Sequence, residues 1–302
     1  MPLRRDLLKL IPPDSWDSHM HILDPAKGKL SVKSQYTPKR HLLPEALEFE
    51  SSVGLQNIVL VQPSCYGNDN TCILDGLRQI GPKNARAVVT FDPNTTAVST
   101  LREWHTIGVR GVRVNLKSVG KEMELNELMG LLRQYADMIR SLDWVLQLYV
   151  PIATVAALEN VIPELRVKVC FDHFGMPELP SQGENSTCFT AGDPYLIPGV
   201  SSLIKLLSQG NTFVKMSAPY RISTEAGHQD LEPVAKELLR VAGRTRVVFA
   251  TDWPHTRFEG LDIEPFMEQV VGWCGNDGVL LERVFRSNAK ELWSIEEEVK
   301  EK

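Results

Sequence analysis

Short apolar runs rich in β-branched residues recur along the chain, and each ends in polar residues. Near-continuous runs of this length are typical of parallel β-strands that are covered on their outer faces. The pattern predicts eight strands, at Trp16–Ile22, Asn57–Ser64, Ala85–Asp92, Val109–Asn115, Trp144–Val150, Lys168–Gly175, Thr212–Ala218 and Arg246–His255.

Helix-like stretches separate these runs. They are Pro44–Val53, Cys72–Ile80, Thr96–Ile107, Glu124–Ser141, Ala153–Ile162, Val200–Ser208, Asp230–Ala242 and Glu264–Trp273. Eight strands that alternate with helices predict an α/β fold closed into a (β/α)8 TIM barrel. The alternative is an open, doubly wound sheet, but no glycine-rich nucleotide loop follows the first strand.

Two connections are longer than a barrel requires. They are Asp24–Pro44 after the first strand and Met176–Gly199 after the sixth, and both contain Pro, Gly and Ser residues. Long loops of this kind often carry function, so we predict that both lie over an active site.

Length and composition narrow the class of protein. A chain of 302 residues with 43% hydrophobic and 24% charged residues predicts one domain spanning residues 1–302. A net charge of -5 without a basic block argues against nucleic acid and favours a small-molecule partner. No signal-peptide cleavage site and no span of roughly 20 apolar residues is present, so a cytoplasmic protein without membrane contact is expected. The oligomeric state stays open.

Five cysteines make an odd number, and none of them forms a CxxC pair. The sequence therefore predicts neither a disulfide framework nor a thiolate metal site. We expect most of these thiols to be small buried hydrophobes or incidental surface groups.

Polar residues gather where the predicted strands end, which is where barrels of this kind build their sites. His19 and His21 share one face of the first strand, because side chains two residues apart point the same way. The other candidates are Ser64, Arg113, Tyr149, Asp172, His173, Tyr220, Arg221, Asp252 and His255. Each has a structural explanation when it is taken singly, and the indication of a site comes from their convergence on one end. His41, His105 and His228 fall in helix or loop positions and are expected at the surface.

Four motifs bear a closer resemblance to a known family. DSHMHI, GVRGVRVN, FDHFG and VVFATDWPH, with RSNAKELW near the C-terminus, resemble the amidohydrolase-related family over nearly the whole chain. HxH is shared by the whole amidohydrolase superfamily. DHFG with TDWPH, and YR after the seventh strand, resemble its 2-pyrone-4,6-dicarboxylate lactonase branch. The resemblance implies a distorted barrel of the amidohydrolase type.

The resemblance also implies roles for the strand-end residues. Asp252 would be the general base, and His19, His21 and His173 would contact the carbonyl or the water. The predicted substrate-binding residues are Tyr36 in the SQYTP stretch, Ser64, Arg113, Tyr149, Arg221 and His255. In the pyrone dicarboxylate enzymes a second arginine follows the strand-4 arginine, and Val119 stands in its place here. We therefore expect poor activity on a dicarboxylated pyrone, with an apolar substituent near Val119.

Lactone hydrolysis requires a base for the attacking water and stabilisation of the carbonyl oxygen, and an aspartate among imidazoles meets both needs. We predict a hydrolase that opens the ring ester of a carboxylated, aromatic-derived lactone. The alternatives are a metal-dependent decarboxylase or sugar-lactone hydrolase of the same superfamily, and a barrel that binds a ligand without catalysis.

Sequence and superfamily disagree on a metal cofactor. A zinc site in this superfamily would use His19, His21, His173 and Asp252. These residues offer four nitrogen or oxygen ligands, which is the number that tetrahedral zinc requires. The fifth strand, however, carries Tyr149 where metal-dependent relatives have a histidine, or a bridging lysine or glutamate. A neutral phenol, with a pKa near 10, is a poor replacement ligand. We predict that no metal or other cofactor is needed and keep zinc as the alternative.

Overall fold

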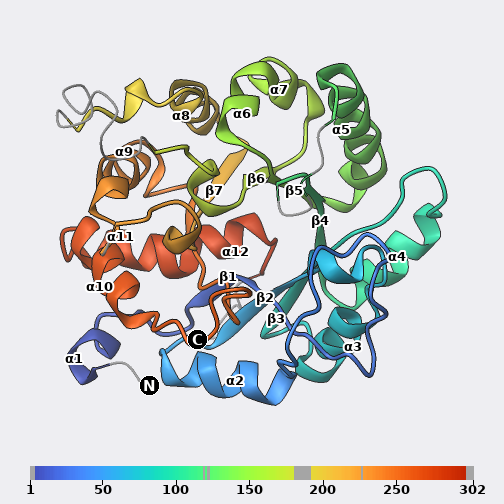
Figure 1. Ribbon diagram of the computed structural model, residues 1–302, viewed down its shortest axis with the longest axis horizontal. Helices are drawn as coiled ribbons and strands as arrows, with labels where there is room; N and C mark the ends of the chain where they lie inside the picture. The colour runs from blue at the N-terminus through green and yellow to red at the C-terminus, as the bar shows by residue number, and fades with distance from the viewer. Residues whose placement is uncertain (1–3, 118–119, 121–122, 180–191, 226, 297–302) are drawn as a thin grey trace, which may run out of the picture.

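Eight parallel strands lie side by side in a single sheet, in the order in which they occur along the chain. The computed structural model describes residues 4–117, 120, 123–179, 192–225 and 227–296. The strands are β1 (Trp16–Met20), β2 (Asn57–Val61), β3 (Ala85–Val89), β4 (Val109–Asn115), β5 (Val145–Tyr149), β6 (Val169–Phe171), β7 (Thr212–Met216) and β8 (Val247–Phe249). Helices surround the sheet (Figure 1). The predicted (β/α)8 barrel is confirmed.

The barrel closes between β8 and β1 through the residues that follow β8. The Asp252 N–H donates to the His19 carbonyl at 2.9 Å, and the His21 N–H donates to the Trp253 carbonyl at 2.7 Å. Below them the Thr251 N–H donates to Asp17 Oδ1 at 3.0 Å. Because this seam uses loop backbone and a carboxylate, it draws Asp252 against the histidine-bearing end of β1.

The helices occupy most of the predicted positions. They are α1 (Arg5–Leu8), α2 (Leu43–Ser52), α3 (Thr71–Ile80), α4 (Val98–Thr106), α5 (Leu125–Ile139), α6 (Ile152–Leu158), α7 (Val161–Leu165), α8 (Val200–Gln209), α9 (Glu232–Ala242), α10 (Glu264–Trp273), α11 (Gly278–Glu282) and α12 (Asn288–Leu292). The single helix predicted at Ala153–Ile162 is two, α6 and α7. Pro163 explains the break, because its ring clashes with the carbonyl four residues earlier, at Glu159.

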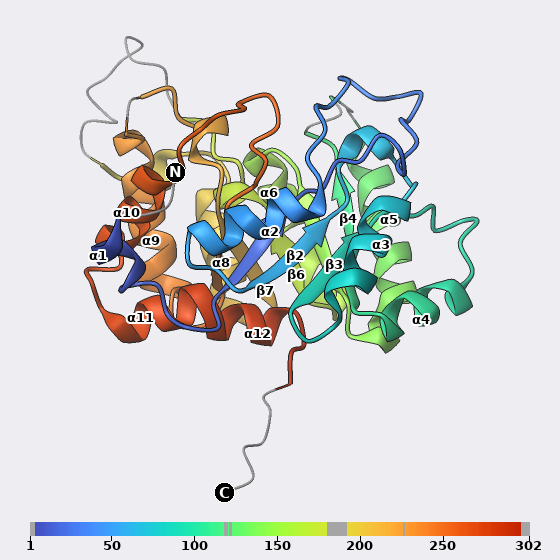
Figure 2. The ribbon, with the colours of Figure 1, turned by 90° about the horizontal axis from the view of Figure 1, so that it is seen from below.

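The RSNAKELW motif supports the end of the barrel opposite the strand C-termini. The Asn288 amide donates to the carbonyls of Gly243 at 2.8 Å and Val247 at 2.7 Å. Trp293 is fully buried and packs with Trp16 and the inward-facing strand residues. Figure 2 shows α12 on this side, and the loops after β1 and β8 on the other. The motif therefore supports the barrel, and the loops lie at the end where the strands stop.

The structure also bears on the cysteines, the second long loop and membrane-spanning helices. The four described cysteines, Cys65, Cys72, Cys170 and Cys274, are buried free thiols, whereas Cys188 lies outside the described residues. Of the long loop predicted at Met176–Gly199, residues 180–191 also lie outside them. Among the helices of the described chain, none is long and apolar enough to span a membrane.

Candidate active site

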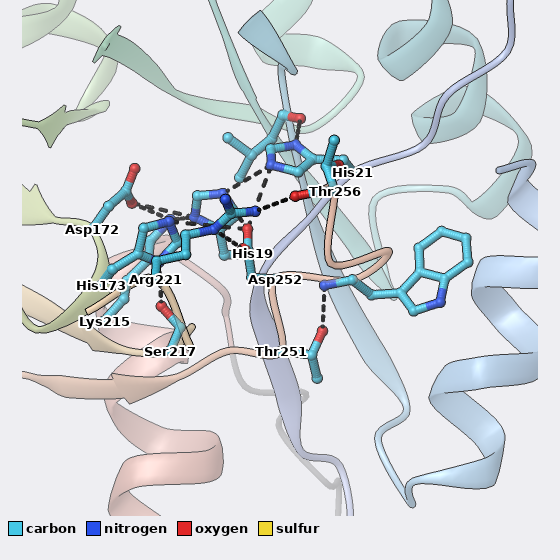
Figure 3. A network of polar contacts seen from close by, with 12 residues as sticks. His19, His21, Asp172, His173, Lys215, Ser217, Arg221, Thr251, Asp252 and Thr256 are labelled. Atoms are coloured by element: carbon cyan, nitrogen blue, oxygen red, sulfur yellow. Dashed lines mark hydrogen bonds and ion pairs between the residues drawn. The ribbon is translucent and has the colours of Figure 1, made fainter. Parts of the chain in front are cut away.

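A cavity of about 330 Å³ opens at the end of the barrel where the strands stop. Eight of the ten predicted site residues line it: His21, Tyr36, Ser64, Arg113, Tyr149, His173, Arg221 and Asp252. The side chains come from strand ends and loops that are far apart in the sequence, and the barrel brings them to one place. Figure 3 shows the polar network at its floor.

Asp252 sits at the centre of that floor and is almost fully buried. Its Oδ2 accepts hydrogen bonds from Arg221 Nε at 2.7 Å and from Tyr220 Oη at 2.7 Å. Its Oδ1 lies 3.6 Å from Nε2 of both His19 and His21. The residue has φ 62°, in the left-handed region that aspartate tolerates better than most residues. One carboxylate oxygen is thus held in place, and the other faces the histidines.

Opposing effects act on the pKa of Asp252. Burial favours the neutral acid, but the Arg221 charge and the nearby histidines outweigh it and hold the pKa well below the usual range. Asp252 is therefore a carboxylate at neutral pH and can accept a proton.

His21 presents a lone pair to the site. Its Nδ1 lies 2.8 Å from the Val61 carbonyl oxygen, which only accepts, so Nδ1 carries the proton. Burial lowers the pKa of His21 to about 4, although Asp252 opposes this, and the ring is neutral at pH 7. Nε2 of His21 therefore accepts hydrogen bonds and cannot donate one. This tautomer excludes donation from His21 Nε2 to a substrate carbonyl.

His19 lies beneath the cavity and is not part of its wall. The side chain is fully buried, and its Nε2 is 3.3 Å from His21 Nε2. Because His21 Nε2 holds a lone pair, hydrogen bonding between these rings requires the proton of His19 on Nε2. The structure does not place His19 among the side chains that line the cavity, and its contact with the carbonyl or the water stays a prediction.

His173 reaches the cavity from the short helical turn η3 (His173–Gly175) after β6. Its Nδ1 lies 2.8 Å from Ser217 Oγ, and its Nε2 lies 4.0 Å from Asp252 Oδ1. Burial lowers the pKa of His173 to about 4, so this ring is also neutral at pH 7. If Ser217 donates to Nδ1, His173 presents an N–H to the cavity.

A second carboxylate, Asp172, organises the charges under the floor. Its Oδ2 accepts from Arg113 Nε at 3.1 Å and from the Gln147 amide at 3.1 Å, and Arg113 Nη2 is 2.9 Å away. Its Oδ1 lies 3.3 Å from Lys215 Nζ. Burial opposes its ionisation, but Lys215, His19 and Arg113 hold the pKa of Asp172 well below the usual range. All of these side chains are buried.

The sequence analysis missed Lys215 and counted Asp172 only among the strand-end candidates, although the sequence around each residue indicates a buried charge. Lys215 is the single charge in the apolar run TFVKMSA, and Asp172 precedes His173 at a strand end. A charged residue in a buried strand is costly unless it has a partner, so either residue pointed to an internal ion pair.

The two predicted substrate-binding arginines already have partners. Arg113 pairs with Asp172, and Arg221 pairs with Asp252 at 2.7 Å. Two cations that the sequence analysis missed, Lys117 and Arg257, also line the cavity. The Arg257 guanidinium lies 4.7 Å from the ring centre of Tyr36, and Lys117 makes an exposed contact of 3.7 Å with Glu178. The positive charges that remain available to a ligand are mainly these two.

His255 is not brought to the cavity wall. It is 3% exposed, and its ring packs edge-on against Phe49 and Tyr220. The structure does not place His255 among the side chains that line the cavity, and its contact with substrate stays a prediction.

The three histidines expected at the surface are half-buried. His105 Nδ1 accepts a hydrogen bond from Trp144 Nε1 at 3.0 Å, and His41 packs edge-on against Trp253. None of the three, His228 included, lines the cavity. Their partial burial is explained by packing and not by a role in the site.

A pair of buried carboxyl groups supports the seam between β1 and β8. Asp17 Oδ1 accepts from the N–H groups of His19 and Thr251, and its Oδ2 accepts from the Thr251 hydroxyl. Glu50 on α2 lies close to Asp17, and burial raises the pKa of Asp17 to about 6 and that of Glu50 well above its usual value. Because Asp17 already has three donors, the proton of the pair belongs on Glu50.

We expect Glu50→Gln to become increasingly stabilising relative to the parent protein as the pH rises. A raised folded-state pKa means that the contribution of Glu50 is full below its ordinary pKa of 4.5 and is lost as the pH rises toward the folded value. Glutamine keeps a donor at every pH. Melting temperatures between acid and alkaline pH measure the effect, with about 2–4 °C expected for each kcal/mol. Glu48→Gln, at an exposed position of α2, is the control. A difference independent of pH would contradict the shared proton.

The donor atoms beside Asp252 suit a metal ion by spacing but not by charge. His19 Nε2, His21 Nε2 and Asp252 Oδ1 lie 3.3–3.6 Å apart, close to the edge of a tetrahedral zinc site. Yet Arg113, Lys215 and Arg221 already exceed Asp172 and Asp252 by one positive charge in this buried region. A divalent cation would raise that excess to three, which burial makes very costly. Protonation of His19 on Nε2 would also remove one ligand. The residues therefore fit zinc poorly.

Known proteins resemble this chain in sequence and in fold. A family model described as Amidohydrolase matches residues 16–295. The chain is 28% identical to a 4-sulfomuconolactone hydrolase from Hydrogenophaga intermedia over 82% of this chain and 77% of that protein. It is 26% identical to a 2-pyrone-4,6-dicarboxylate hydrolase from Comamonas testosteroni over 81% and 78%. A solved structure described as a putative 2-pyrone-4,6-dicarboxylic acid hydrolase from Pseudomonas putida superimposes with a TM-score of 0.75 at 25% identity, covering 95% of this chain and 100% of that chain.

Proposed function

Because this chain belongs to the amidohydrolase family, whose model matches residues 16–295, we propose that it hydrolyses the ring ester of a carboxylated, aromatic-derived lactone without a metal ion. The observation that carries the proposal is the Asp252 carboxylate, held by Arg221 and Tyr220 on one oxygen and open to the cavity side on the other. Two relatives that are named as hydrolases of a muconolactone and of a pyrone support the choice of a lactone.

The attacking water would bind beside Asp252 Oδ1 and donate one hydrogen bond to it. The lone pair of His21 Nε2 accepts from His19 Nε2–H, so Asp252 alone orients the water. As the oxygen attacks the lactone carbonyl, Asp252 takes one proton. A base positioned in this way typically contributes about 10²–10⁴-fold.

The carbonyl oxygen becomes an oxyanion and needs donors. His173, with Ser217 donating to its Nδ1, offers Nε2–H from the cavity wall. The Arg113 guanidinium is the second donor. Its ion pair with Asp172 fixes the position of the guanidinium group and leaves some of its N–H groups unused. When the intermediate collapses, the C–O bond of the ring breaks and Asp252 returns its proton to the departing ring oxygen. The product is a hydroxy acid or, from an enol lactone, an enol acid that can tautomerise to the keto acid.

We expect the free acid of such a lactone to be a far better substrate than its methyl ester. A carboxylate would meet Arg257 and Lys117 at the mouth of the cavity and the remaining N–H groups of Arg113 or Arg221, whereas an ester has no charge. Loss of charge-assisted hydrogen bonds predicts a fall of about 10–100-fold in kcat/KM. The assay follows ring opening by loss of ultraviolet absorbance.

Arg257→Gln should reduce the preference for the acid, and Arg244→Gln, in a surface ion pair with Asp277, should not. Equal kcat/KM for acid and ester would remove the carboxylate from the proposal. The expected apolar substituent near Val119 stays a prediction, because Val119 lies outside the described residues.

Exhaustive chelation should leave kcat/KM unchanged. The positive charge beside Asp252 disfavours a divalent ion, and the base does not need one. Metal content by elemental analysis should be substoichiometric in the active protein. Activity that disappears on chelation and returns with Zn²⁺ or Mn²⁺ would contradict this prediction. It would favour the alternative function, a metal-dependent decarboxylase or sugar-lactone hydrolase. Ligand binding without turnover across the lactone panel would instead favour a non-catalytic barrel.

A further inference from the structure

Lys215 is a buried charged residue that has no role in the proposed reaction steps. It lies in the middle of β7, its side chain is fully buried, and it is not part of the cavity wall. The ring of Trp293 lies below it, 5.3 Å from Nζ. Burying an ammonium group here costs several kcal/mol unless its partners compensate. The contacts of Lys215 with those partners therefore determine whether the charge is tolerated.

Two acceptors surround the ammonium group. Nζ lies 3.3 Å from Asp172 Oδ1 and 3.1 Å from His19 Nδ1 (Figure 3). A lysine ammonium carries three donors and no acceptor, so a hydrogen bond with His19 requires a lone pair on Nδ1. A neutral imidazole has one proton, which must then lie on Nε2.

The opposite tautomer is disfavoured by the same contact. If His19 Nδ1 carried the proton, it would donate to Asp172 Oδ1, 3.2 Å away, as metal-binding histidines commonly do with a carboxylate. That proton would, however, lie beside the ammonium group of Lys215. Two donors facing each other at 3.1 Å repel, whereas in the Nε2–H form the ammonium group donates to both the Nδ1 lone pair and Asp172 Oδ1. Lys215 therefore favours the Nε2–H form.

This selection extends through the site as one chain of hydrogen bonds. Lys215 donates to His19 Nδ1, His19 Nε2 donates to His21 Nε2 at 3.3 Å, and His21 Nδ1 donates to the Val61 carbonyl at 2.8 Å. Every donor in the chain meets an acceptor. The two rings are thereby fixed beside Asp252 without a metal ion between them.

We propose that Lys215 acts as the resident cation of this site in place of a divalent metal: it holds His19 in the Nε2–H tautomer, positions His21 beside Asp252, and prevents His19 from ligating a metal. This inference rests on the metal-independent hydrolysis proposed above. Lys215 is a positioning residue, because it acts through His19 and His21 and does not touch the substrate.

The test combines histidine ¹⁵N NMR with metal uptake in Lys215→Met, which keeps the length of the side chain and removes the donor. In the parent protein at neutral pH, His19 should show a protonated Nε2 and an unprotonated Nδ1. In the variant the proton should move to Nδ1, facing Asp172, and the protein should bind close to one equivalent of Zn²⁺ that the parent does not bind. Loss of such a positioning group predicts a fall in kcat of about 10–100-fold without added metal.

Lys168→Met is the matched control. Lys168 pairs with Asp143 at 2.8 Å and bonds Ser294 at the opposite end of the barrel, so its loss should change neither the His19 resonances nor zinc binding. A Lys215→Met protein with unchanged His19 resonances and parental kcat would overturn the inference and leave the hydrolase proposal in place. If that variant does not fold, an Nδ1–H signal for His19 in the parent protein overturns it equally. Nε2–H on His19 in a protein that opens no lactone would support the role of Lys215 and refute the proposed function.

Discussion

Asp252→Asn should lower kcat by at least about 100-fold while leaving KM and the fold nearly unchanged. Arg221 Nε and Tyr220 Oη both donate to the Oδ2 position of residue 252, so an asparagine must place its carbonyl oxygen there. Its amide group then occupies the Oδ1 position, 3.6 Å from His21 Nε2. The amide is a donor and cannot take a proton, so the site would have neither a base nor an acceptor to orient the water.

Steady-state kinetics on the best lactone acid measure this effect, and the melting temperature and circular dichroism check the fold. Asp143→Asn is the control, because Asp143 pairs with Lys168 away from the cavity. A variant that retains more than about a tenth of the parental kcat would exclude Asp252 as the base, since a positioned base contributes at least about 100-fold.

Asp172→Asn should be the most destabilising single substitution in the site, at about 3–5 kcal/mol. The carboxylate faces two buried cations, Lys215 and Arg113. An amide of the same shape keeps the packing but leaves both charges without a counter-ion. Because the pKa of Asp172 is depressed, its stabilisation is present above its ordinary pKa of 3.8 and is lost as the pH falls through the folded value.

Urea unfolding at neutral pH measures the free energy of unfolding. The double variant Asp172→Asn with Lys215→Met should be less destabilised than the sum of the two single variants, because it removes one of the stranded cations. Additive effects would mean that these two side chains do not interact in the folded protein. Asp193→Asn, at an exposed position far from the ion pairs of the floor, should change the stability little.

The order of elements could be predicted because it depends on local properties of the chain. The lengths of the apolar runs and their alternation with helical stretches follow from which residues must be buried, and the eight strands lie where these runs occur. The same reasoning found Asp252, His21 and His173, since a polar residue that ends a barrel strand faces the open end. Predictions failed where a second feature intervened, as at Pro163, which divides one expected helix.

Hydrogen-bond partners and charge balance were decided only by the tertiary structure. Spacing along β1 places His19 and His21 on one face, but only the strands on either side determine that His21 meets the cavity and His19 meets Lys215. Likewise, the sequence contains Arg113 and Arg221 without indicating that buried aspartates already neutralise them. A side chain's protonation state and its freedom to bind a ligand depend on the groups around it in space, and those groups come from residues up to 234 apart along the chain.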